Sequence, residues 1–432
     1  MNVRRREVFG YCMFDFANSS YTTLISTVAY SVYFRQAVVG AQDPRGDFLW
    51  SVAQVIAYLI LIALAPVFGA LADYSGRKKR FLLLTTIQTV AACALLALVG
   101  PGDVALGMIL LIVGMIGFEG GYVFYNAFLP EVSTPETIGR VSGWSWGMGF
   151  IGGLLALLAC TPFLARPLIG SGTGAVDLEA VGGYRISFVI VAVFFAVFAV
   201  PTFLFLRERA APRSLASPWD YVTAGFRRVA DTISHLRRYR ETAKYVASTL
   251  FFYGGIDTVI KFSAIYASVT FGIDGKELSL LFIFMNIIAV PGTLLAGYAA
   301  DRIGGKRALA ITLTAWIVLL FFGAVARSRI TFWIMASGIA IGMGSTQAIG
   351  RSYMAQISPP ARESEFFGFY ILCSKIGSIF SLLLFGLISS WSGNQRLAVL
   401  SVVPFFVVGL ALLLWIDDNR ARRAAPAPGS AT

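Results

Sequence analysis

Charged residues are scarce in this sequence. Only 13% of the 432 residues are charged and 57% are hydrophobic, whereas soluble domains carry about a quarter charged residues. A soluble core of this size cannot bury so much apolar surface, so we expect lipid to surround most of the chain. This composition excludes a cytosolic enzyme, a secreted disulfide scaffold and a disordered chain.

Groups that build metal sites, disulfides and nucleotide sites are also few. The single histidine, His235, cannot form a metal cluster. The sequence contains no Walker motif and no readable nucleophile–base pairing, so we predict no cofactor, no metal and no enzymatic activity. Four cysteines lie inside apolar segments and are predicted to be free thiols: Cys12, Cys93, Cys160 and Cys373.

Long apolar runs are abundant instead. A bilayer-spanning helix needs about 20 mainly apolar residues, and these runs are continuous rather than alternating, which favours helices over a barrel. The first run carries Asp15 and Asn18 and is too long for a signal peptide, so we predict that it is retained. Twelve transmembrane helices are predicted near 8–36, 48–72, 81–99, 105–130, 141–165, 184–206, 244–271, 277–300, 307–326, 330–356, 366–390 and 397–416.

The basic residues between the runs indicate topology. The net charge is +12, and 24 of the 35 Lys and Arg residues fall in the termini and the even-numbered connections, against eight in the odd ones. Cytoplasmic loops carry the excess of Lys and Arg, so both termini are predicted in the cytoplasm. A nucleic-acid partner is not indicated, because these residues do not form a soluble basic face.

The longest connection, 207–243, falls midway along the chain. Its apolar residues recur at three- and four-residue steps, which indicates an amphipathic helix on the inner leaflet; the alternative is a soluble regulatory helix. We therefore predict an N-terminal six-helix bundle at 1–206, this linker, a C-terminal six-helix bundle at 244–418 and a disordered cytoplasmic tail at 419–432. The apolar face comprises Trp219, Val222, Phe226, Val229, Ile233 and Leu236.

The two halves repeat one motif. Gly69-Ala-Leu-Ala-Asp73-Tyr-Ser-Gly76-Arg77-Lys follows the second run, and Gly297-Tyr-Ala-Ala-Asp301-Arg302-Ile-Gly-Gly-Lys306 follows the eighth. Glycine lets two helix ends approach closely, and the Asp can cap a helix N-terminus or pair with an Arg such as Arg140. Two six-helix halves related in this way are typical of transporters. The alternative is an ordinary basic cytoplasmic loop.

A Gly-rich hexapeptide, Gly147–Gly152, spells GxGxxG. The dinucleotide-binding interpretation needs a preceding strand and a soluble βαβ unit, and neither is indicated. We predict that these glycines allow close helix packing instead.

Six charges lie inside the predicted spans, and they sum to zero. Each costs about 2.5–3.5 kcal/mol or more at mid-membrane, so a function or a partner is expected. We interpret Glu119, Asp257 and Asp15 as proton-coupling candidates, and Arg351 as the anchor for a carboxylate, because an arginine does not lose its proton. The set is Asp15, Glu119, Asp257, Lys261, Arg351 and Lys375.

Alternatives accompany three of these charges. Asp257 and Lys261 stand four residues apart and could simply pair on one helix face. Glu119 could form a salt bridge to Arg351 or Lys375, and Asp15 lies close enough to the cytoplasmic end for a gating role. Polar groups on the same helices complete the predicted substrate site, which comprises Asn18, Tyr21, Tyr125, Asn126, Gln347, Arg351 and Lys375.

Several blocks together resemble one family. Phe14–Tyr21 (FDFANSSY), Phe124–Glu131 (FYNAFLPE), Gly139–Gly143 (GRVSG), Gln347–Ser352 (QAIGRS) and Glu365–Tyr370 (EFFGFY) are similar to the Atg22-like family of the major facilitator superfamily. The resemblance implies two pseudo-symmetric bundles and a cytoplasmic latch comprising Gly69, Asp73, Gly76, Arg77, Asp301, Arg302 and Arg140. It also implies release of amino acids. The sequence departs from the family at Tyr253-Gly-Gly-Ile-Asp257 and adds Lys261, which leaves the substrate open.

The sequence therefore predicts a secondary transporter that works by alternating access in a bacterial inner membrane. The predicted substrate is a small polar or zwitterionic metabolite, with amino acids or small peptides favoured, moved as an exporter and coupled to protons. The other expected partner is membrane lipid, and the protein is expected to be a monomer. Two alternatives remain open: a flippase for lipids or other amphipathic molecules, which needs a lateral opening and an apolar upper cavity, and a non-transporting membrane receptor.

Overall fold

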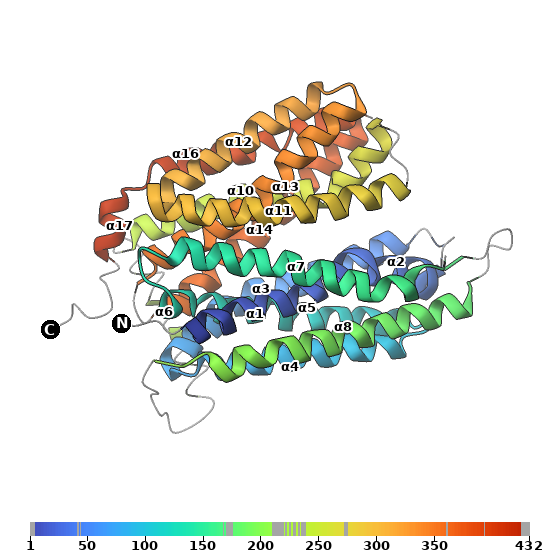
Figure 1. Cartoon of the computed structure of the whole chain (residues 1–432), viewed down its shortest axis with the longest axis horizontal. Coiled ribbons are helices and arrows are strands. Elements are labelled where there is room, and N and C mark those ends of the chain that lie inside the picture. Colours follow the sequence, from blue (N-terminus) through green and yellow to red (C-terminus); the bar gives the residue numbers. More distant parts are fainter. Residues whose placement is uncertain are drawn as a thin grey trace. The chain divides into compact units, whose positions relative to one another are not determined.

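The computed structural model is helical throughout its described part (Figure 1). Apart from the isolated bridge between Ile169 and Val176, no strand pairing occurs among the described residues. The predicted amphipathic helix at 207–243 lies largely outside them. The structure describes residues 5–40, 43, 45–166, 168–169, 176–209, 220, 223, 226–227, 230–231, 234, 239–271, 275–359, 362–392 and 394–424.

Long helices connected by short segments make up the chain. Two stretches near the N-terminus, η1 and η2, are π-helical, and η3 is a 3₁₀ turn. In chain order the elements are α1 (Arg5–Ser20), η1 (Tyr21–Val28), α2 (Tyr30–Tyr33), η2 (Phe34–Gly40), α3 (Gly46–Ser75), α4 (Lys78–Leu95), η3 (Leu96–Leu98), α5 (Val104–Asn126), α6 (Leu129–Val132), α7 (Ile138–Leu164), α8 (Leu178–Phe205), α10 (Arg240–Phe271), α11 (Gly275–Ile303), α12 (Gly305–Val325), α13 (Arg329–Ile357), α14 (Glu363–Ser392), α15 (Gln395–Leu400), α16 (Val403–Leu414) and α17 (Asp418–Ala424).

Most of these helices are suited to a bilayer. Among the described residues, nine are long and apolar enough to cross one, and ten if the bent pair Leu49–Leu64 and Val67–Ser75 forms one span. The expected segments 8–36 and 244–271 are helical but are not among the nine. The first segment is divided into α1, η1, α2 and η2, the longest of which has 16 residues, and the second carries Asp257 and Lys261 among its polar residues. The all-helical membrane fold is confirmed, while the count of twelve spans is not.

Contacts group the chain into two compact units. Unit 1 comprises residues 1–63, 77–125 and 148–208, and unit 2 comprises 64–76, 126–147 and 209–432. Unit 2 thus holds the C-terminal helices together with two short segments from the first half of the chain. Both of these segments contain residues of the predicted latch.

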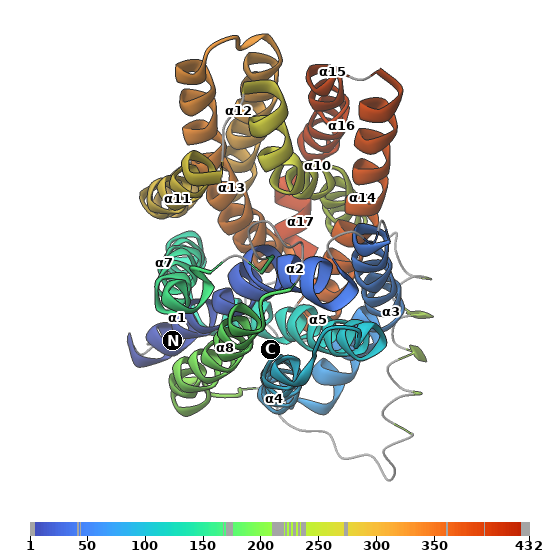
Figure 2. The ribbon, with the colours of Figure 1, turned by 90° about the vertical axis from the view of Figure 1, so that its right-hand side faces the viewer.

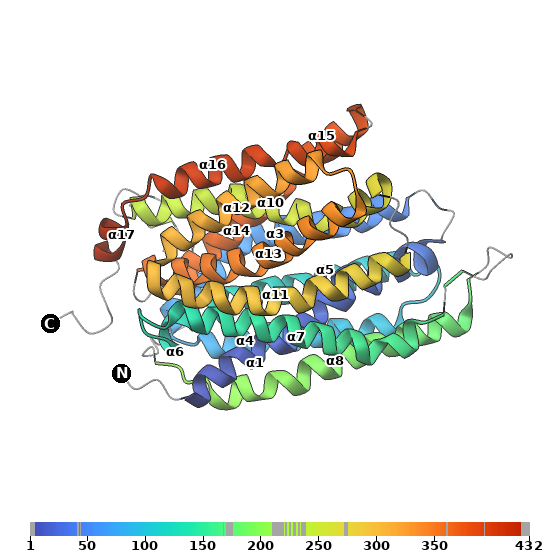
Figure 3. The same ribbon diagram turned by 45° about the horizontal axis from the view of Figure 1, so that its top comes forward.

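In unit 1, α8 packs along α1 and α4 (Figure 3). Side chains fix the pairing of α4 and α8 at both ends. The Lys79 ammonium donates to the carbonyl of Leu206, 2.6 Å away. At the other end the Arg185 guanidinium donates to the carbonyl of Val99 over 3.0 Å. Each cation satisfies a carbonyl that a helix end would otherwise leave without a partner.

Unit 2 repeats this arrangement. There α12 packs against α13 and α16, and α10 packs against α14 and α16 (Figure 2). The Lys306 ammonium donates to the carbonyl of Ile416 over 2.6 Å, and Arg396 donates to the carbonyl of Ala324 over 2.9 Å. One Lys and one Arg therefore cap corresponding helix ends in both halves, which agrees with the internal repeat seen in the sequence.

Glycines allow two backbone crossings. A Cβ added to Gly152 on α7 would collide with the carbonyl of Phe16 on α1, and one added to Gly377 on α14 would collide with the carbonyl of Leu250 on α10. These glycines occupy matched positions in the repeat. The GxGxxG segment that contains Gly152 therefore contributes to helix packing, as predicted.

The chain beyond α16 begins with a helix. Residues 418–424 form α17, where the sequence led us to expect a disordered tail from 419. The hydroxyl of Tyr353 on α13 donates to Asp418 Oδ1 over 3.1 Å, and Ala421 is fully buried. Residues 425–432 lie outside the described part.

Candidate functional site

The second copy of the repeated motif holds the start of α7. Asp301, near the end of α11, accepts hydrogen bonds from the backbone N–H groups of Gly139 and Arg140, at 2.7 and 3.0 Å. It also accepts one from Arg140 Nε at 3.0 Å. An acidic side chain that receives the first N–H groups of a helix stabilises its positive end. Glycine is required at 139 and 297, because a Cβ at either position would collide with the backbone carbonyl oxygen of the other glycine.

The first copy acts in the same way on α14. Asp73, near the end of α3, accepts the backbone N–H of Glu365 at 2.9 Å. A Cβ added to Gly69 would collide with the backbone of Ser364. Gly76 adopts a positive φ of 63°, which suits the residue that ends a helix. We call the end of unit 2 that contains Asp73, Asp301, Gly139, Arg140 and Glu365 the latch end.

Two basic residues of the motif take no part in these contacts. Arg77 and Arg302 are exposed. The Asp and Gly residues of the predicted latch thus make the helix-to-helix contacts, and these two arginines contribute charge at the surface.

Arg351 on α13 also contacts α7. Its Nε donates to the hydroxyl of Ser142 over 3.0 Å, and its Nη2 donates to the carbonyl of Ser142 over 2.9 Å. The Ser142 hydroxyl in turn donates to the carbonyl of Ala348 over 2.7 Å. The guanidinium carbon lies 5.5 Å from the ring centre of Trp146. The hydrogen bonds from Arg351 to Ser142 therefore connect α13 to α7, and the Arg351 side chain is buried, with only 2% of its surface exposed.

Three tyrosine hydroxyls converge beside Arg351. Tyr245 donates to the carbonyl of Gly350 over 2.8 Å, and the hydroxyls of Tyr253 and Tyr370 lie 2.5 Å apart. A Cβ added to Gly350 would come within 2.8 Å of the Tyr253 hydroxyl, so the glycine makes room for the three phenols. Tyr245, Tyr253 and Tyr370 belong to α10 and α14, the helices with the Gly377 crossing.

Asp257 lies one helical turn beyond Tyr253. Its Oδ2 accepts a hydrogen bond of 2.5 Å from the hydroxyl of Ser378 on α14. Lys261, predicted as its partner, has an exposed side chain. Because Tyr253 adjoins both Asp257 and Gly350, a half-buried carboxylate and a buried guanidinium lie at the two ends of one polar path in unit 2.

In unit 1 the polar residues of α1 face α5. The Tyr122 hydroxyl lies 3.5 Å from Asp15 Oδ1 and 3.3 Å from Asn18 Oδ1. Asp15 and Asn18 are each 1% exposed. The cluster is therefore screened from the surroundings of unit 1.

Other residues of the predicted substrate site have packing contacts. Tyr125 is fully buried, stacks on Tyr11 and donates to the carbonyl of that residue over 3.0 Å. Tyr21, 1% exposed, stacks on Phe118. Asn126 is buried. Glu119, Gln347 and Lys375 are half-buried.

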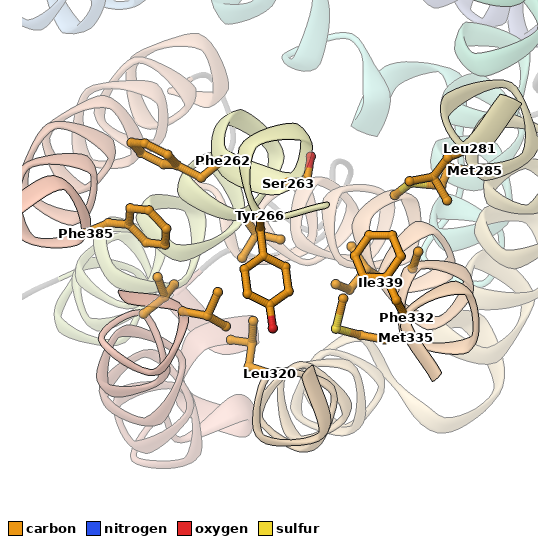
Figure 4. Close-up of a pocket in the computed structure, with 14 residues that line it drawn as sticks. Phe262, Ser263, Tyr266, Leu281, Met285, Leu320, Phe332, Met335, Ile339 and Phe385 are labelled. Atoms are coloured by element: carbon orange, nitrogen blue, oxygen red, sulfur yellow. The ribbon is translucent and has the colours of Figure 1, made fainter. Parts of the chain in front are cut away.

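An apolar cavity lies in unit 2 between α10, α11, α12, α13, α14 and α15 (Figure 4). About 40 Å³ of it is open to the centre of a water-sized sphere, and about 620 Å³ of space lies between its wall atoms when its open side is counted. Phe262 and Tyr266 of α10, Met335 of α13 and Phe385 of α14 form part of its wall. No predicted site residue lines it, because the predicted site consists of charged and polar residues and this lining is almost wholly apolar.

Sequence reasoning missed Ser142, Tyr245 and Ser378. Ser142 lies within the GRVSG block, and that block was the available signal. Ser378 directly follows Gly377, a position matched in the repeat. Nothing local distinguishes Tyr245 from a packing tyrosine.

A family model described as "Vacuole effluxer Atg22 like" matches residues 50–426. The chain belongs to this Atg22-like family. An "Uncharacterized MFS-type transporter YxiO" of Bacillus subtilis (strain 168) is 28% identical over 411 residues, which cover 95% of this chain and 94% of that protein. "Autophagy-related protein 22-1" of Penicillium rubens is 22% identical, over 92% of this chain and 79% of that protein.

Solved structures agree on the fold of this Atg22-like protein. The major facilitator superfamily transporter FucP superposes with a TM-score of 0.72 at 13% identity, covering 96% of this chain and all of that one. The human organic anion transporter MFSD10 gives a TM-score of 0.70 at 15% identity, covering 95% and 99%. The protein is a multi-pass membrane transporter of the major facilitator superfamily. Its relatives and structural neighbours are transporters, not enzymes.

Proposed function

We propose that this transporter moves a small zwitterionic metabolite, an amino acid or a small peptide, by alternating access. The observation that carries the proposal is the polar path from Asp257 through Tyr253 to Gly350 and Arg351. A zwitterion presents an ammonium to a carboxylate and a carboxylate to a guanidinium, and charge-assisted hydrogen bonds of this kind are the strong ones. Gln347 and Lys375, on the same two helices as Arg351 and Tyr370, complete the proposed site.

Arg351 links binding to movement in this proposal. Its guanidinium here donates to Ser142 on α7, so a substrate carboxylate has to replace these hydrogen bonds. A ligand shifts a conformational equilibrium only through its different affinity for the two states. The substrate carboxylate replaces Ser142 as the hydrogen-bond acceptor of Arg351, and this replacement supplies the difference in affinity. In the proposed mechanism, the contacts of Asp301 and Asp73 at the latch end open in the same step.

Protons are the proposed driving ion. Asp257 is the favoured carrier, because its carboxylate both receives the Ser378 hydroxyl and lies on the substrate path. Glu119, half-buried in α5, is a second candidate carrier. Since the pair Asp257 and Arg351 is neutral overall, protonation of Asp257 changes the charge balance in which the substrate ammonium binds.

Direction and placement follow from the family and the charge distribution. The family description names an effluxer, and we propose export from the cytoplasm as a monomer. The excess of Lys and Arg in the termini and even-numbered connections supports cytoplasmic termini in a bacterial inner membrane.

The apolar cavity favours a second candidate function. A transporter or flippase of amphipathic molecules needs room for an alkyl or aryl group, and the cavity walled by Phe262, Tyr266 and Met335 offers it. We rank this function second because the cavity is separate from the polar path between Asp257 and Arg351.

Uptake into proteoliposomes tests the proposal. The purified protein is reconstituted and offered amino acids, dipeptides, organic ions and lipids, with and without a pH gradient. Saturable uptake of a zwitterion that accelerates with the gradient supports it. Uptake confined to lipids or other amphipathic molecules favours the second candidate. If zwitterion transport has the same rate with and without the pH gradient, the proposal of proton coupling is wrong.

A further inference from the structure

Three helix ends of unit 1 meet at one corner. The Thr202 hydroxyl near the end of α8 donates to the carbonyl of Gly10, near the start of α1, over 2.8 Å (Figure 3). The start of α4 joins the same end of α8, because the Lys79 ammonium donates to the carbonyl of Leu206 over 2.6 Å. We call this part of unit 1 the basic corner, and it comprises residues 5–8, 77–80 and 206–208.

The basic corner carries an excess of positive charge. Its three segments hold seven basic residues and two acidic ones, Glu7 and Glu208, so the two carboxylates neutralise at most two of the seven cations. The five arginines of the corner are exposed, and among the described residues no ion pair or hydrogen bond engages their guanidinium groups. They are therefore available to an anion from outside the chain. These arginines are Arg5, Arg6, Arg77, Arg80 and Arg207.

The protein already places one anionic oxygen at this corner. Glu208 Oε1 accepts the backbone N–H of Lys79, in the first turn of α4, over 3.0 Å. The first N–H groups of a helix attract anions, because they have no partner within the helix and lie at its positive end. The carboxylate of Glu208 thus shows that the start of α4 accepts an anionic group, and the exposed arginines beside it favour a further one.

The corresponding corner of unit 2 is nearly balanced in charge. There Glu241, at the start of α10, accepts the Lys244 ammonium over 2.9 Å and the backbone N–H of Asp417 over 2.7 Å. Asp417 also pairs with Arg420 over 3.1 Å. The segments 240–244, 304–307 and 415–418 together hold four basic and three acidic residues. The large excess of positive charge therefore belongs to the basic corner of unit 1 and is not repeated with the fold.

Exposed apolar side chains lie one helical turn from the arginines. Phe9 follows Arg6 by three residues on α1 and is 50% exposed, and Leu84 follows Arg80 by four residues on α4 and is 57% exposed. Residues at these spacings are neighbours on one helix face. Each of the two helices thus presents a guanidinium group and then an apolar surface, which matches the order of headgroup and acyl chain in an anionic phospholipid.

The distribution of the charges favours a headgroup with two phosphates. Arg5 and Arg6 belong to α1, Arg77 and Arg80 stand at the start of α4, and α8 packs against both helices. A guanidinium group binds phosphate oxygens through two parallel hydrogen bonds. Two phosphates joined in one headgroup can engage both pairs of arginines at once, so the second contact is made at a high effective concentration. Basic pockets between transmembrane helices bind headgroups of this kind.

We propose that the basic corner binds a phospholipid with two phosphates, of the cardiolipin type. Its phosphates contact the arginines of α1 and α4, and its acyl chains lie along Phe9 and Leu84. The site lies within unit 1, apart from the polar path of Asp257 and Arg351. It goes beyond the proposed transport of a zwitterion, and its test needs no transported solute.

Native mass spectrometry of the purified full-length protein in detergent tests the site, because it counts bound lipid molecules one by one. Cardiolipin is titrated, and phosphatidylglycerol is titrated at equal phosphate concentration. We expect the apparent Kd of the first cardiolipin to be roughly tenfold or more below that of phosphatidylglycerol. Equal affinities would overturn the proposal, because a general attraction to anionic lipid predicts them. Free pyrophosphate has two phosphates without acyl chains and should not displace the lipid; displacement at the concentration of cardiolipin itself would also overturn it.

Variants of the arginines locate the site. Arg6→Gln combined with Arg80→Gln is expected to raise the Kd for cardiolipin about tenfold. The matched control, Arg240→Gln combined with Arg307→Gln, removes two exposed charges from the helix starts of unit 2 and should leave this Kd unchanged. Arg6→Lys combined with Arg80→Lys keeps both charges and should retain most of the binding. Equal losses in the two Gln variants, or as large a loss in the Lys variant as in its Gln counterpart, would contradict the proposed site.

Discussion

Arg351 donates two hydrogen bonds to Ser142, one to its hydroxyl and one to its carbonyl, at 3.0 and 2.9 Å. The two residues lie 209 positions apart in the chain, on α13 and α7. The arginine is 2% exposed, so these contacts are made away from water and are worth more than they would be at a surface. In our account, a substrate carboxylate competes with Ser142 for this guanidinium.

Ser142→Ala is predicted to strengthen substrate binding. The variant keeps the hydrogen bond from Arg351 to the backbone carbonyl of residue 142 but removes the one to the hydroxyl. The conformation in which Arg351 binds α7 therefore becomes less stable by about 1–3 kcal/mol. The apparent Kd for substrate, measured by titration of the purified protein, should fall by roughly tenfold. The matched control is Ser145→Ala, a buried serine one turn further along α7. An unchanged or weakened affinity in Ser142→Ala would count against the exchange.

Asp301→Ala is predicted to lower stability and to loosen the latch end. It leaves the backbone N–H groups of Gly139 and Arg140 without their acceptor, at a cost of about 1–3 kcal/mol. Differential scanning fluorimetry should show a lower unfolding temperature, whereas Arg302→Ala, which removes the exposed neighbour, should not. Equal effects of the two substitutions would remove Asp301 from this role.

Gly377→Ala is predicted to disrupt the crossing of α10 and α14. The new Cβ would collide with the carbonyl of Leu250, which cannot move away without bending α10. Overpacking of this kind costs about 1–3 kcal/mol or more. Gly386→Ala lies on the same helix, where an added Cβ meets nothing within 4 Å, and should be neutral or stabilising by up to about 1 kcal/mol. Thermal unfolding in detergent compares the two, and a Gly377→Ala protein as stable as Gly386→Ala would contradict the packing argument.

Asp257→Asn is predicted to make transport independent of the pH gradient. The amide keeps the shape of the side chain and can still contact Ser378, but it cannot take up a proton. Exchange of substrate across proteoliposomes without a gradient should persist, while accumulation driven by the gradient should be lost. Accumulation at the unmodified rate would exclude Asp257 as the carrier.

Filling the apolar cavity separates the two candidate functions. Ala336, buried in its wall on α13, can be replaced by Phe. Transport of amphipathic solutes should then fall while transport of a zwitterion is retained. Loss of both activities together with an unchanged unfolding temperature would place the cavity on the zwitterion's path.

Much of this architecture could be predicted from the sequence because apolar runs and repeated motifs are local signals. The GALADYSGRK and GYAADRIGGK segments predicted that Asp73 and Asp301 would contact other helices, and both receive backbone N–H groups. The role of Arg351 was harder to predict. Its charge and depth predicted a partner, but Ser142 carries no charge and lies far away in the sequence, so no spacing rule connects them.

Tyr21 and Tyr125 illustrate a related limit. Tyr21 directly follows α1, which carries Asp15, and Tyr125 lies on α5, which carries Glu119. The sequence does not tell which face a phenol occupies. In the structure both rings pack against neighbouring aromatic residues: Tyr125 stacks on Tyr11, and Tyr21 stacks on Phe118. The tail beyond α16 is a further case, since α17 is held by the contact between Tyr353 and Asp418 rather than by its own apolar content.

The most direct test of the zwitterion site is competition for transport in proteoliposomes. A transported amino acid is challenged with its N-acetyl and its carboxamide derivatives, each of which removes one charge. The account predicts that neither derivative competes effectively, because Asp257 loses the ammonium in the first and Arg351 loses the carboxylate in the second. Competition by both derivatives at the affinity of the parent amino acid would contradict it.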